Sequence, residues 1–420
     1  MSKKLSIKNI GPIKNIDITL NKVNVFMGQQ SSGKSTIAKI ISFCAWIEKD
    51  ISIHQSFSHY LKDNNFREKL EIFHKMKGYI NKDSEITYVG DAIKLHFKSN
   101  KLSLDWIDSR FDYKKCKISY IPSERSMVIL PEMEKVEFPN NYLKSFLFDW
   151  FDTRKNYTKD NKLDILNTGL SFYFSEEHKE NHISNDDYDI LLSQASSGLQ
   201  TVTPLITMID NLINNIYKQD QKASYELDEV KANVTQLIIS EFILKPVYGS
   251  DFLEDRELRK EKIKELNHKI ANSDEVVLEC FEKYKEVRAN LFETHRSDLI
   301  VEEPEQNLFP STQKDLIYNI LELINTQLNH TLSMTTHSPY VLYALNNCIL
   351  YSIVKKNKQL KNIDLSCKKS EISPELISIY EIKDGEINNI QNEMGLIGDN
   401  FFDSQMKEVM DDFYSMLNYL

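Results

Sequence analysis

The sequence predicts an α/β protein with a mixed central sheet and an inserted α-helical arm, on three observations. Short apolar runs such as Val23–Met27 and Leu299–Val301 have the length and composition of buried strands. The first run leads directly into a loop with two glycines and then into a helical pattern. Residues 205–292 have an almost wholly helical pattern, and they lie between segments in which strands and helices alternate.

The whole chain has the length and composition of a globular protein of two or three domains. It has 420 residues, of which 41% are hydrophobic and 27% charged. No apolar run approaches the roughly 18 residues of a membrane span, and the N-terminus lacks a signal-peptide h-region. We therefore expect a cytoplasmic protein with no membrane partner. The net charge of −10 repels a phosphate backbone, so DNA is expected only at a local basic patch.

Residues 28–36 form the most specific motif, because Gly28 to Ser35 fits G-x-x-x-x-G-K-[ST]. The backbone N–H groups of such a loop surround phosphates, Lys34 reaches the β- and γ-phosphates, and the Ser35 hydroxyl is placed to ligate Mg²⁺. The following helix directs its N-terminal dipole at the same phosphates. The predicted nucleotide contacts are Gly28, Gln29, Gln30, Ser31, Ser32, Gly33, Lys34, Ser35 and Thr36.

Other strands follow from alternating or continuous apolar residues. We expect them over 5–7, 16–20, 93–97, 118–121, 332–336, 348–353 and 377–382. The first two flank a Gly11-Pro12 turn, which indicates an antiparallel pair, and Asp384-Gly385 predicts a hairpin. Residues 175–189, rich in Asp, Asn and His, are expected to form a loop. The segment Ser123-Glu124-Arg125 places charge at the end of a buried strand, where α/β ligand sites gather.

Paired carboxylates end the apolar run at 299–301. Glu302 and Glu303 are adjacent on a strand and therefore point to opposite faces, so that one can serve Mg²⁺ while the other reaches an attacking water. A charged junction between strand and loop explains the pattern equally well when it is taken alone.

Two weaker signals lie on either side of the helical insertion. Ser338 and Pro339 suit the N-cap and first position of a helix, which places His337 at the end of a strand just before it. A lone histidine there is usually structural. The S-S-G-x-Q pattern at 196–200 is consistent with an ordinary helix cap.

The insertion is expected to be a helical hairpin with a break near 271–274, where Asn272 and Glu275 fit an N-cap and its N3 partner. Its second helix has an apolar seam at 3-4-3-4 spacing: Val277, Cys280, Tyr284, Val287 and Leu291. Because so short a helix is marginal alone, the seam must pack on its own body, on a second copy or on another protein.

Four signals therefore stand in one order: the loop at 28–36, then 196–200, 299–303 and His337. This order resembles the ABC-type ATPases of the SMC/RecF/OLD group, over residues 1–205 and 290–395. The motifs Glu-Glu-Pro-Glu-x-Asn-Leu-x-Pro and Thr-Thr-His-Ser-Pro are similar to those of the OLD-type branch.

The resemblance implies an ABC-type P-loop NTPase fold in four parts. Residues 1–204 carry the Walker A and signature motifs, and 293–395 carry Walker B and the switch histidine. Residues 205–292 are the helical insertion, expected to hold a second copy or an effector, and 396–420 form a C-terminal helical tail.

The resemblance also implies roles for single residues, with ATP and Mg²⁺ as cofactors. Lys34 and Ser35 keep the roles given above, and Glu302 takes the place of the family's Mg²⁺-supporting Asp. Glu303 matches the general base and His337 the γ-phosphate contact. The signature residues, which reach the ATP of a partner protomer and so imply a head-to-tail homodimer or higher homo-oligomer, are Ser196, Ser197 and Gly198.

The leading hypothesis is an OLD-like ATPase of anti-phage defence that acts as a nucleotide-gated sensor or scaffold for a separately encoded nuclease or toxin effector. No D-x-D follows His337, so a fused nuclease is not expected. Two alternatives remain open: a RecF- or SMC-like DNA-repair ATPase, and a scaffold that holds ATP with little turnover. Glu302 in place of Asp keeps the last alternative open, because the longer side chain is expected to slow hydrolysis.

Overall fold

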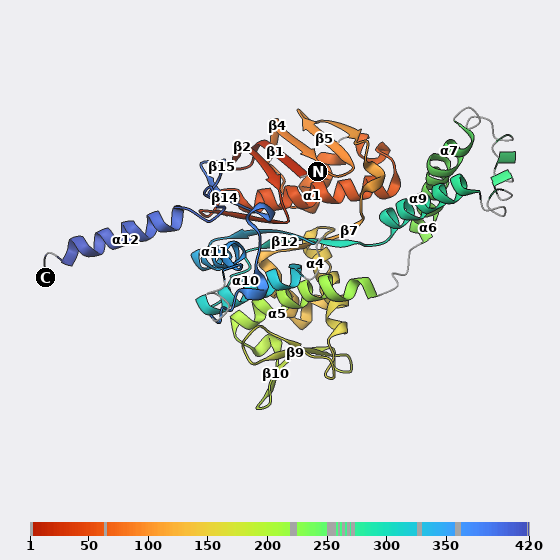
Figure 1. Cartoon of the computed structure of the whole chain (residues 1–420). Helices are drawn as coiled ribbons and strands as arrows, with labels where there is room; N and C mark the ends of the chain where they lie inside the picture. Colours follow the sequence, from red (N-terminus) through yellow and green to blue (C-terminus); the bar gives the residue numbers. More distant parts are fainter. Residues whose placement is uncertain are drawn as a thin grey trace.

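The computed structural model describes residues 3–62, 65–218, 225–249, 274–325, 330–357 and 363–417, with single positions 258, 261, 262, 265, 266, 269 and 419. Its centre is an 11-stranded mixed sheet in the order β6-β5-β4-β1-β2-β15-β14-β3-β13-β12-β7. Helices cover this sheet, and two helical projections leave the body on opposite sides (Figure 1). The predicted α/β fold with a mixed central sheet is confirmed.

One half of the sheet is parallel. Its strands, in spatial order, are β14 (Ile377–Lys383), β3 (Val23–Gly28), β13 (Thr331–Thr336), β12 (Arg296–Glu302) and β7 (Cys116–Ile121). The carboxyl ends of parallel strands meet at one edge, where α/β proteins place their ligands. The loops after β3, β12, β13 and β7 therefore converge, although they are far apart in the sequence.

The other half is antiparallel. It contains β1 (Lys3–Ile10), β2 (Ile13–Leu20), β4 (Ile80–Val89), β5 (Ile93–Lys98) and β6 (Lys101–Trp106). Strand β15 (Glu386–Asn389) pairs with β14 through the predicted hairpin. Asp384 and Gly385 both have positive φ, at 54° and 82°, as a type I′ turn requires.

The sheet separates two cores. In β3, Val25 and Met27 face one core and Phe26 the other, so the strand is buried on both sides. Helix α1 (Lys34–His54) covers one face, with α2 (Ser58–Leu61) and α3 (Asn65–Phe73) nearby. The opposite face carries α4 (Tyr142–Thr153), α5 (Ser197–Asp210), α10 (Pro310–Asn325) and α11 (Pro339–Val354).

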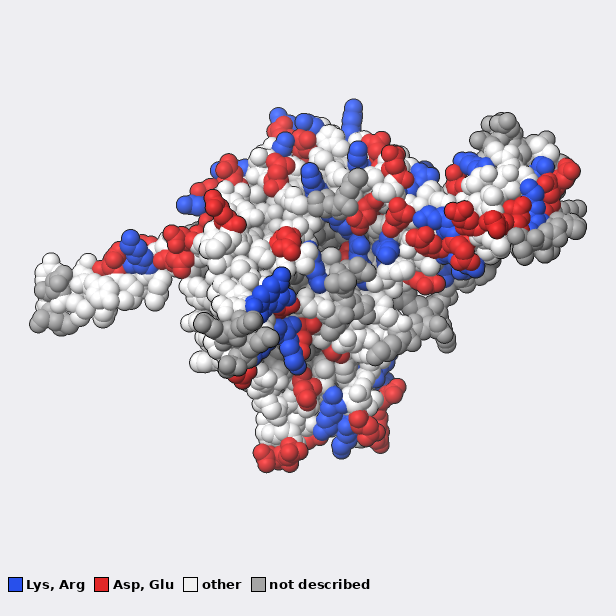
Figure 2. Space-filling model, viewed as in Figure 1, with Lys and Arg blue, Asp and Glu red and all other residues white. Residues whose placement is uncertain are grey.

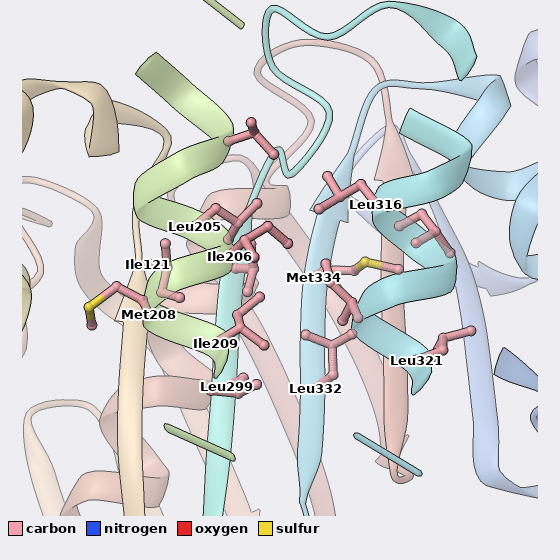
Figure 3. Packing of buried hydrophobic residues seen from close by; sticks show 14 of the residues in the cluster. Ile121, Leu205, Ile206, Met208, Ile209, Leu299, Leu316, Leu321, Leu332 and Met334 are labelled. Atoms are coloured by element: carbon pink, nitrogen blue, oxygen red, sulfur yellow. The ribbon is translucent and has the colours of Figure 1, made fainter. Parts of the chain in front are cut away.

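Figure 3 shows how α5 and α10 fill the second core. Leu205, Ile206 and Ile209 of α5 lie over β12, and Leu316 and Leu321 of α10 lie beside β13. Residues 205–210, which the sequence assigns to the insertion, therefore pack within the body as the continuation of the helix that begins at the signature motif.

Two sequence predictions are wrong. The run 348–353 lies in α11, where Cys348 and Ile349 are buried while Leu350 and Ile353 are exposed. A run of six residues, five of them apolar, does not distinguish a strand from one turn and a half of helix. The expected loop at 175–189 contains the whole of strand β10 (Glu180–Ser184). This strand belongs to a four-stranded sheet with β8 (Leu163–Asp164), β9 (Ser171–Ser175) and β11 (Asp189–Leu191).

The helical arm consists of α6 (Tyr225–Ile239), a π-helical turn (Ser240–Leu244), α7 (Lys245–Tyr248) and α9 (Glu275–Phe292), and it projects from the body (Figure 1). Its seam packs within the same chain. Val277 contacts the cluster of Ile243, Leu244 and Leu266, whereas Val287 and Leu291 join the core on the α1 side. Of the three predicted destinations, the structure shows the chain's own body.

The predicted cap Asn272 lies outside the described residues. The cap that the structure describes is Asp274, whose carboxylate accepts from the N–H groups of Val276 at 3.1 Å and Val277 at 3.2 Å.

Helix α12 (Phe401–Leu417) forms the second projection, within the predicted tail. None of its described residues is buried, and Met406, Val409, Phe413 and Met416 are exposed. Figure 2 shows an outer half that is largely uncharged, whereas Lys, Arg, Asp and Glu are interspersed on the helical arm. Among the described residues, no helix is both long and apolar enough to cross a membrane.

Candidate functional site

The two glycines of the P-loop lie where neighbouring atoms leave no room for a Cβ. A Cβ at Gly28 would lie 2.6 Å from the carbonyl oxygen of Ile382, so the loop passes directly over β14. Gly33, the N-cap of α1, has a φ of 108°, and a Cβ there would lie 2.3 Å from Ile13 Cδ1. The conformation and the packing of this loop both require glycine at these positions.

Lys34 is held over the loop by two carbonyl groups. Its side chain is 5% exposed, and Nζ donates to Gly28 O at 2.9 Å and Gln29 O at 2.7 Å. Burial lowers the pKa of Lys34 to about 8, although Glu303 and Glu305 act in the opposite direction. The loop thus presents an ammonium group that a phosphate would stabilise.

A groove of about 760 Å³ adjoins the loop. Its walls are residues 28–32, Pro12, Lys14, residues 381–385 and the segment 399–405 with Phe401. This volume lies within the range of small-molecule sites, roughly 300–1,000 Å³. The C-terminal wall is a feature that no local sequence pattern indicated. A hollow of about 780 Å³ between α1, α3 and α4 contains none of the predicted site residues.

Glu302 ends β12 as predicted and is 3% exposed. Its Oε2 accepts from the Ser123 N–H at 3.4 Å, while its Oε1 is buried and has no hydrogen-bond partner among the described residues. Ser35, on the P-loop side, is exposed. Mg²⁺ in nucleotide sites takes one or two protein oxygens and completes its shell with phosphates and water, so a hydroxyl and a free carboxylate oxygen suit it.

Glu303 and His337 meet across the ends of β12 and β13. His337 Nε2 lies 3.5 Å from Glu303 Oε1, and this bond holds the pKa of Glu303 below its ordinary value against the effect of burial. Glu303 has a φ of 44°. A non-glycine residue in this region costs about 1–3 kcal/mol and is found mainly at functional sites. The pair brought together by the structure is the one that the sequence predicted as base and switch histidine.

The backbone of His337 is fixed by a residue that the sequence analysis did not single out. Glu305 Oε1 accepts from the His337 N–H at 2.6 Å, and Glu305 is buried, which raises its pKa. The predicted N-cap is confirmed, since Ser338 Oγ accepts from the Tyr340 N–H at 3.1 Å. Ser338 also bonds to Gln313 of α10. Two adjacent helices and a buried carboxylate therefore position the histidine.

The signature residues lie at the start of helix α5. Ser196 is the N-cap of α5 without a side-chain cap bond, and Ser196 and Ser197 are exposed. A Cβ at Gly198 would lie 2.9 Å from the carbonyl oxygen of Asn307, so this helix end packs closely on the loop after Walker B. Within the described residues, no hydrogen bond joins residues 196–198 to residues 28–36.

These features define an ABC-type P-loop NTPase fold, as the sequence predicted. A buried parallel strand enters the glycine loop, one strand separates it from the strand of the paired glutamates, and an antiparallel sheet extends one edge. No family model matches the chain, and no curated protein matches it either.

Comparison with solved structures gives distant likenesses. An Smc head bound to the C-winged helix domain of ScpA aligns with 93% of this chain and 97% of its own, at 9% identity and a TM-score of 0.39. The SMC head domain from Thermotoga maritima covers 94% and 100%, at 10% identity and a TM-score of 0.37. The recombination mediator protein RecF covers 93% and 98%, at 10% identity and a TM-score of 0.29. Because these scores are low, the fold class rests on the chain's own topology.

Proposed function

We propose that this protein binds and hydrolyses ATP. The observation that carries the proposal is the convergence, at one edge of the sheet, of the P-loop lysine with a strained glutamate that contacts a histidine. The groove beside the loop provides room for the nucleoside, and the loop itself provides N–H groups and Lys34 for the phosphates.

In this proposal each residue has one task. Lys34 exchanges its two carbonyl partners for the β- and γ-phosphates, and Ser35 and Glu302 hold Mg²⁺, which neutralises phosphate charge when bound. Glu303, kept ionised by His337, accepts the proton of the attacking water. His337, fixed by Glu305, contacts the γ-phosphate and reports its presence to α11.

The proposed active form is a head-to-tail dimer or a higher oligomer containing that dimer. Support comes from the exposed signature serines, which form no described bond with the P-loop of their own chain and so are available to the ATP of another copy. A finer proposal is that the protein is a defence ATPase that gates a separately encoded nuclease or toxin. The OLD-like motifs at residues 302–310 and 335–339 support it. The helical arm and α12 provide surface for such a partner.

The alternatives predict different behaviour. A DNA-repair ATPase would be stimulated by DNA, whereas the arm in Figure 2 carries acidic residues among its basic ones and so favours a protein partner. A scaffold with little turnover would hold ATP for many minutes without releasing phosphate. The fixed contact between Glu303 and His337 favours turnover.

The test is phosphate release by the purified full chain with Mg²⁺ and ATP, compared with Glu303→Gln. We expect the variant to bind ATP normally and to hydrolyse it about 10² to 10⁴-fold more slowly, as for loss of a positioned base. A matched control is Glu286→Gln, an exposed residue of α9. Equal rates for the wild type and Glu303→Gln would refute the assignment of the base.

A further inference from the structure

Arg125 is completely buried at the edge of the sheet where the loops after β3, β7, β12 and β13 converge. It follows β7, in a 3₁₀ helix whose N-cap is Pro122, and its side chain is 0% exposed. Its guanidinium donates to five carbonyl oxygens from three parts of the chain. These belong to Pro122 at 3.3 Å, Thr201 at 3.2 Å, Glu302 at 2.8 Å, Glu303 at 2.7 Å and Pro304 at 3.3 Å.

This arrangement uses the whole guanidinium. The group has five N–H donors, and Nε donates once while Nη1 and Nη2 donate twice each. A buried cation is usually compensated by a carboxylate, yet all the hydrogen-bond acceptors described for Arg125 are backbone carbonyls. Burial lowers the pKa of Arg125 to about 10, so the side chain stays charged at neutral pH. All of its hydrogen bonds therefore fix backbone, while Glu302, Glu303 and Glu305 act on its charge without accepting a hydrogen bond from it.

The backbone that it fixes is the strained turn at Glu303. On one side the Glu303 N–H donates to Thr335 O at 3.0 Å, and on the other side Arg125 Nη2 binds the Glu303 carbonyl. The positive φ of Glu303 is thus constrained through both of its peptide groups. This constraint sets the direction in which the carboxylate leaves the chain, toward His337.

The same guanidinium reaches helix α5, which begins at the signature motif. Thr201 lies one turn into α5, and its carbonyl binds Nε. A second hydrogen bond connects α5 to the loop after β12, from Asn307 Nδ2 to Thr201 Oγ1 at 3.3 Å. A displacement of α5 therefore changes the acceptor set of the group that holds Glu303.

We propose that Arg125 is a positioning residue that holds the catalytic turn at Glu303 and couples it to the signature helix α5. The inference rests on the proposed ATPase function and adds to it the route by which engagement of Ser196–Gly198 reaches the base. Arg125 itself has no exposed surface. Its effect on the reaction is therefore exerted through the backbone that it holds, chiefly the turn at Glu303.

The first test is Arg125→Lys, which keeps the charge but replaces the planar five-donor fork by a single ammonium group. We expect the dissociation constant for a non-hydrolysable ATP analogue to stay within about twofold of wild type, since Lys34 is untouched. The value of kcat should fall about 10²-fold, as misplacement of a reacting group by 1 Å does. Arg154→Lys is the matched control, because Arg154 is another buried arginine that packs on Phe151 and Phe174 outside the site.

A double-mutant cycle separates positioning from general stability. If Arg125 acts through Glu303, Arg125→Lys should reduce kcat little further in the Glu303→Gln background, while the losses in Tm of the two changes add. A kcat for Arg125→Lys equal to that of wild type, or a full multiplicative loss in the double variant, would overturn the proposal. A wild-type chain that hydrolyses no ATP would instead overturn the proposed function.

Should Arg125→Lys fail to fold, Arg125→Gln tests the same coupling. The glutamine amide keeps two N–H donors in place of five and leaves Lys34, Glu303 and Thr201 unchanged. The coupling predicts a lower kcat at unchanged ATP affinity. An unchanged kcat in a folded Arg125→Gln protein would contradict it.

Discussion

The proposed ATP site has two halves, the P-loop with Walker B and the signature motif. Within one chain, hydrogen bonds and ion pairs fix the side chains of the first half but not those of the second. On the P-loop and Walker B side, Lys34, Glu303 and His337 are each held by described hydrogen bonds or ion pairs, and the contacts of His337 join residues more than thirty positions apart. On the signature side, Ser196 and Ser197 are exposed, and the cap side chain is unbonded. The difference supports the proposal that one chain binds ATP and that catalysis needs two.

The first half should lose ATP binding when Lys34 is replaced. Lys34→Ala removes the cation that the loop holds for phosphate, so we expect ATP affinity to fall by at least about 10²-fold. Isothermal titration calorimetry measures this directly. Lys39→Ala, on the same helix but outside the loop, should bind as wild type does, and normal binding by Lys34→Ala would refute the nucleotide site.

The second half should fail without loss of binding. Ser196→Arg places a bulky side chain at the exposed end of α5, and we expect a single chain to bind ATP with unchanged affinity while kcat falls about 10²-fold, as when preorganised donors are lost. Fluorescent-nucleotide titration and phosphate release separate the two quantities. Weaker ATP binding by this variant, at chain concentrations too low for the wild type to dimerise, would show that the signature belongs to the site of its own chain.

The pH dependence of ATP affinity sharpens the account of the first half. The pKa of Lys34 is about 8 in the free chain, and bound phosphate raises it, so binding takes up a proton above this pH. Affinity should be constant below pH 8 and fall as pH rises through 8, by up to about tenfold per unit. Calorimetry at pH 8 in two buffers of different ionisation enthalpy should reveal uptake of about half a proton. No proton uptake would contradict the lowered pKa.

The smallest effect concerns the helical arm. Asp274→Ala removes the N-cap of α9, which costs about 1 kcal/mol and should speed hydrogen exchange at the start of α9 about fivefold. ATP affinity should not change, because the cap lies outside the site. Glu279→Ala, exposed in the middle of the same helix, is the control. Altered ATP binding in Asp274→Ala would show that the arm is coupled to the first half.

The motifs of the site were predictable because each is local. The P-loop, the end of β12 and the cap at Ser338 are specified by neighbouring residues, and all three lie where the sequence placed them. The sequence did not predict the roles of Arg125, Glu305 and the groove wall at 399–405. Each contacts residues distant in the sequence, as Arg125 contacts Glu303, and no sequence pattern indicates such contacts.

The errors in the fold have a similar cause. The apolar run in α11 satisfied both strand and helix patterns, and only its packing against the sheet decided between them. The polar strand β10 was not recognised because His182 is partly buried by stacking on Tyr173 and by a 2.9 Å bond to Asp189, which are contacts between strands. The seam of α9 was correctly identified as a packing face, and of the destinations left open the structure shows contacts within the same chain. Replacing Val277 or Val287 by Asp is therefore expected to unfold the arm and does not report on assembly.

The central claim is that one chain binds ATP and two chains hydrolyse it, and mass photometry of Glu303→Gln tests it most directly. With ATP and Mg²⁺ this variant should accumulate as a dimer or a multiple of it, and the Ser196→Arg/Glu303→Gln variant should stay a monomer with ATP bound. Monomers in both samples at saturating ATP, or dimers in both, would contradict the account.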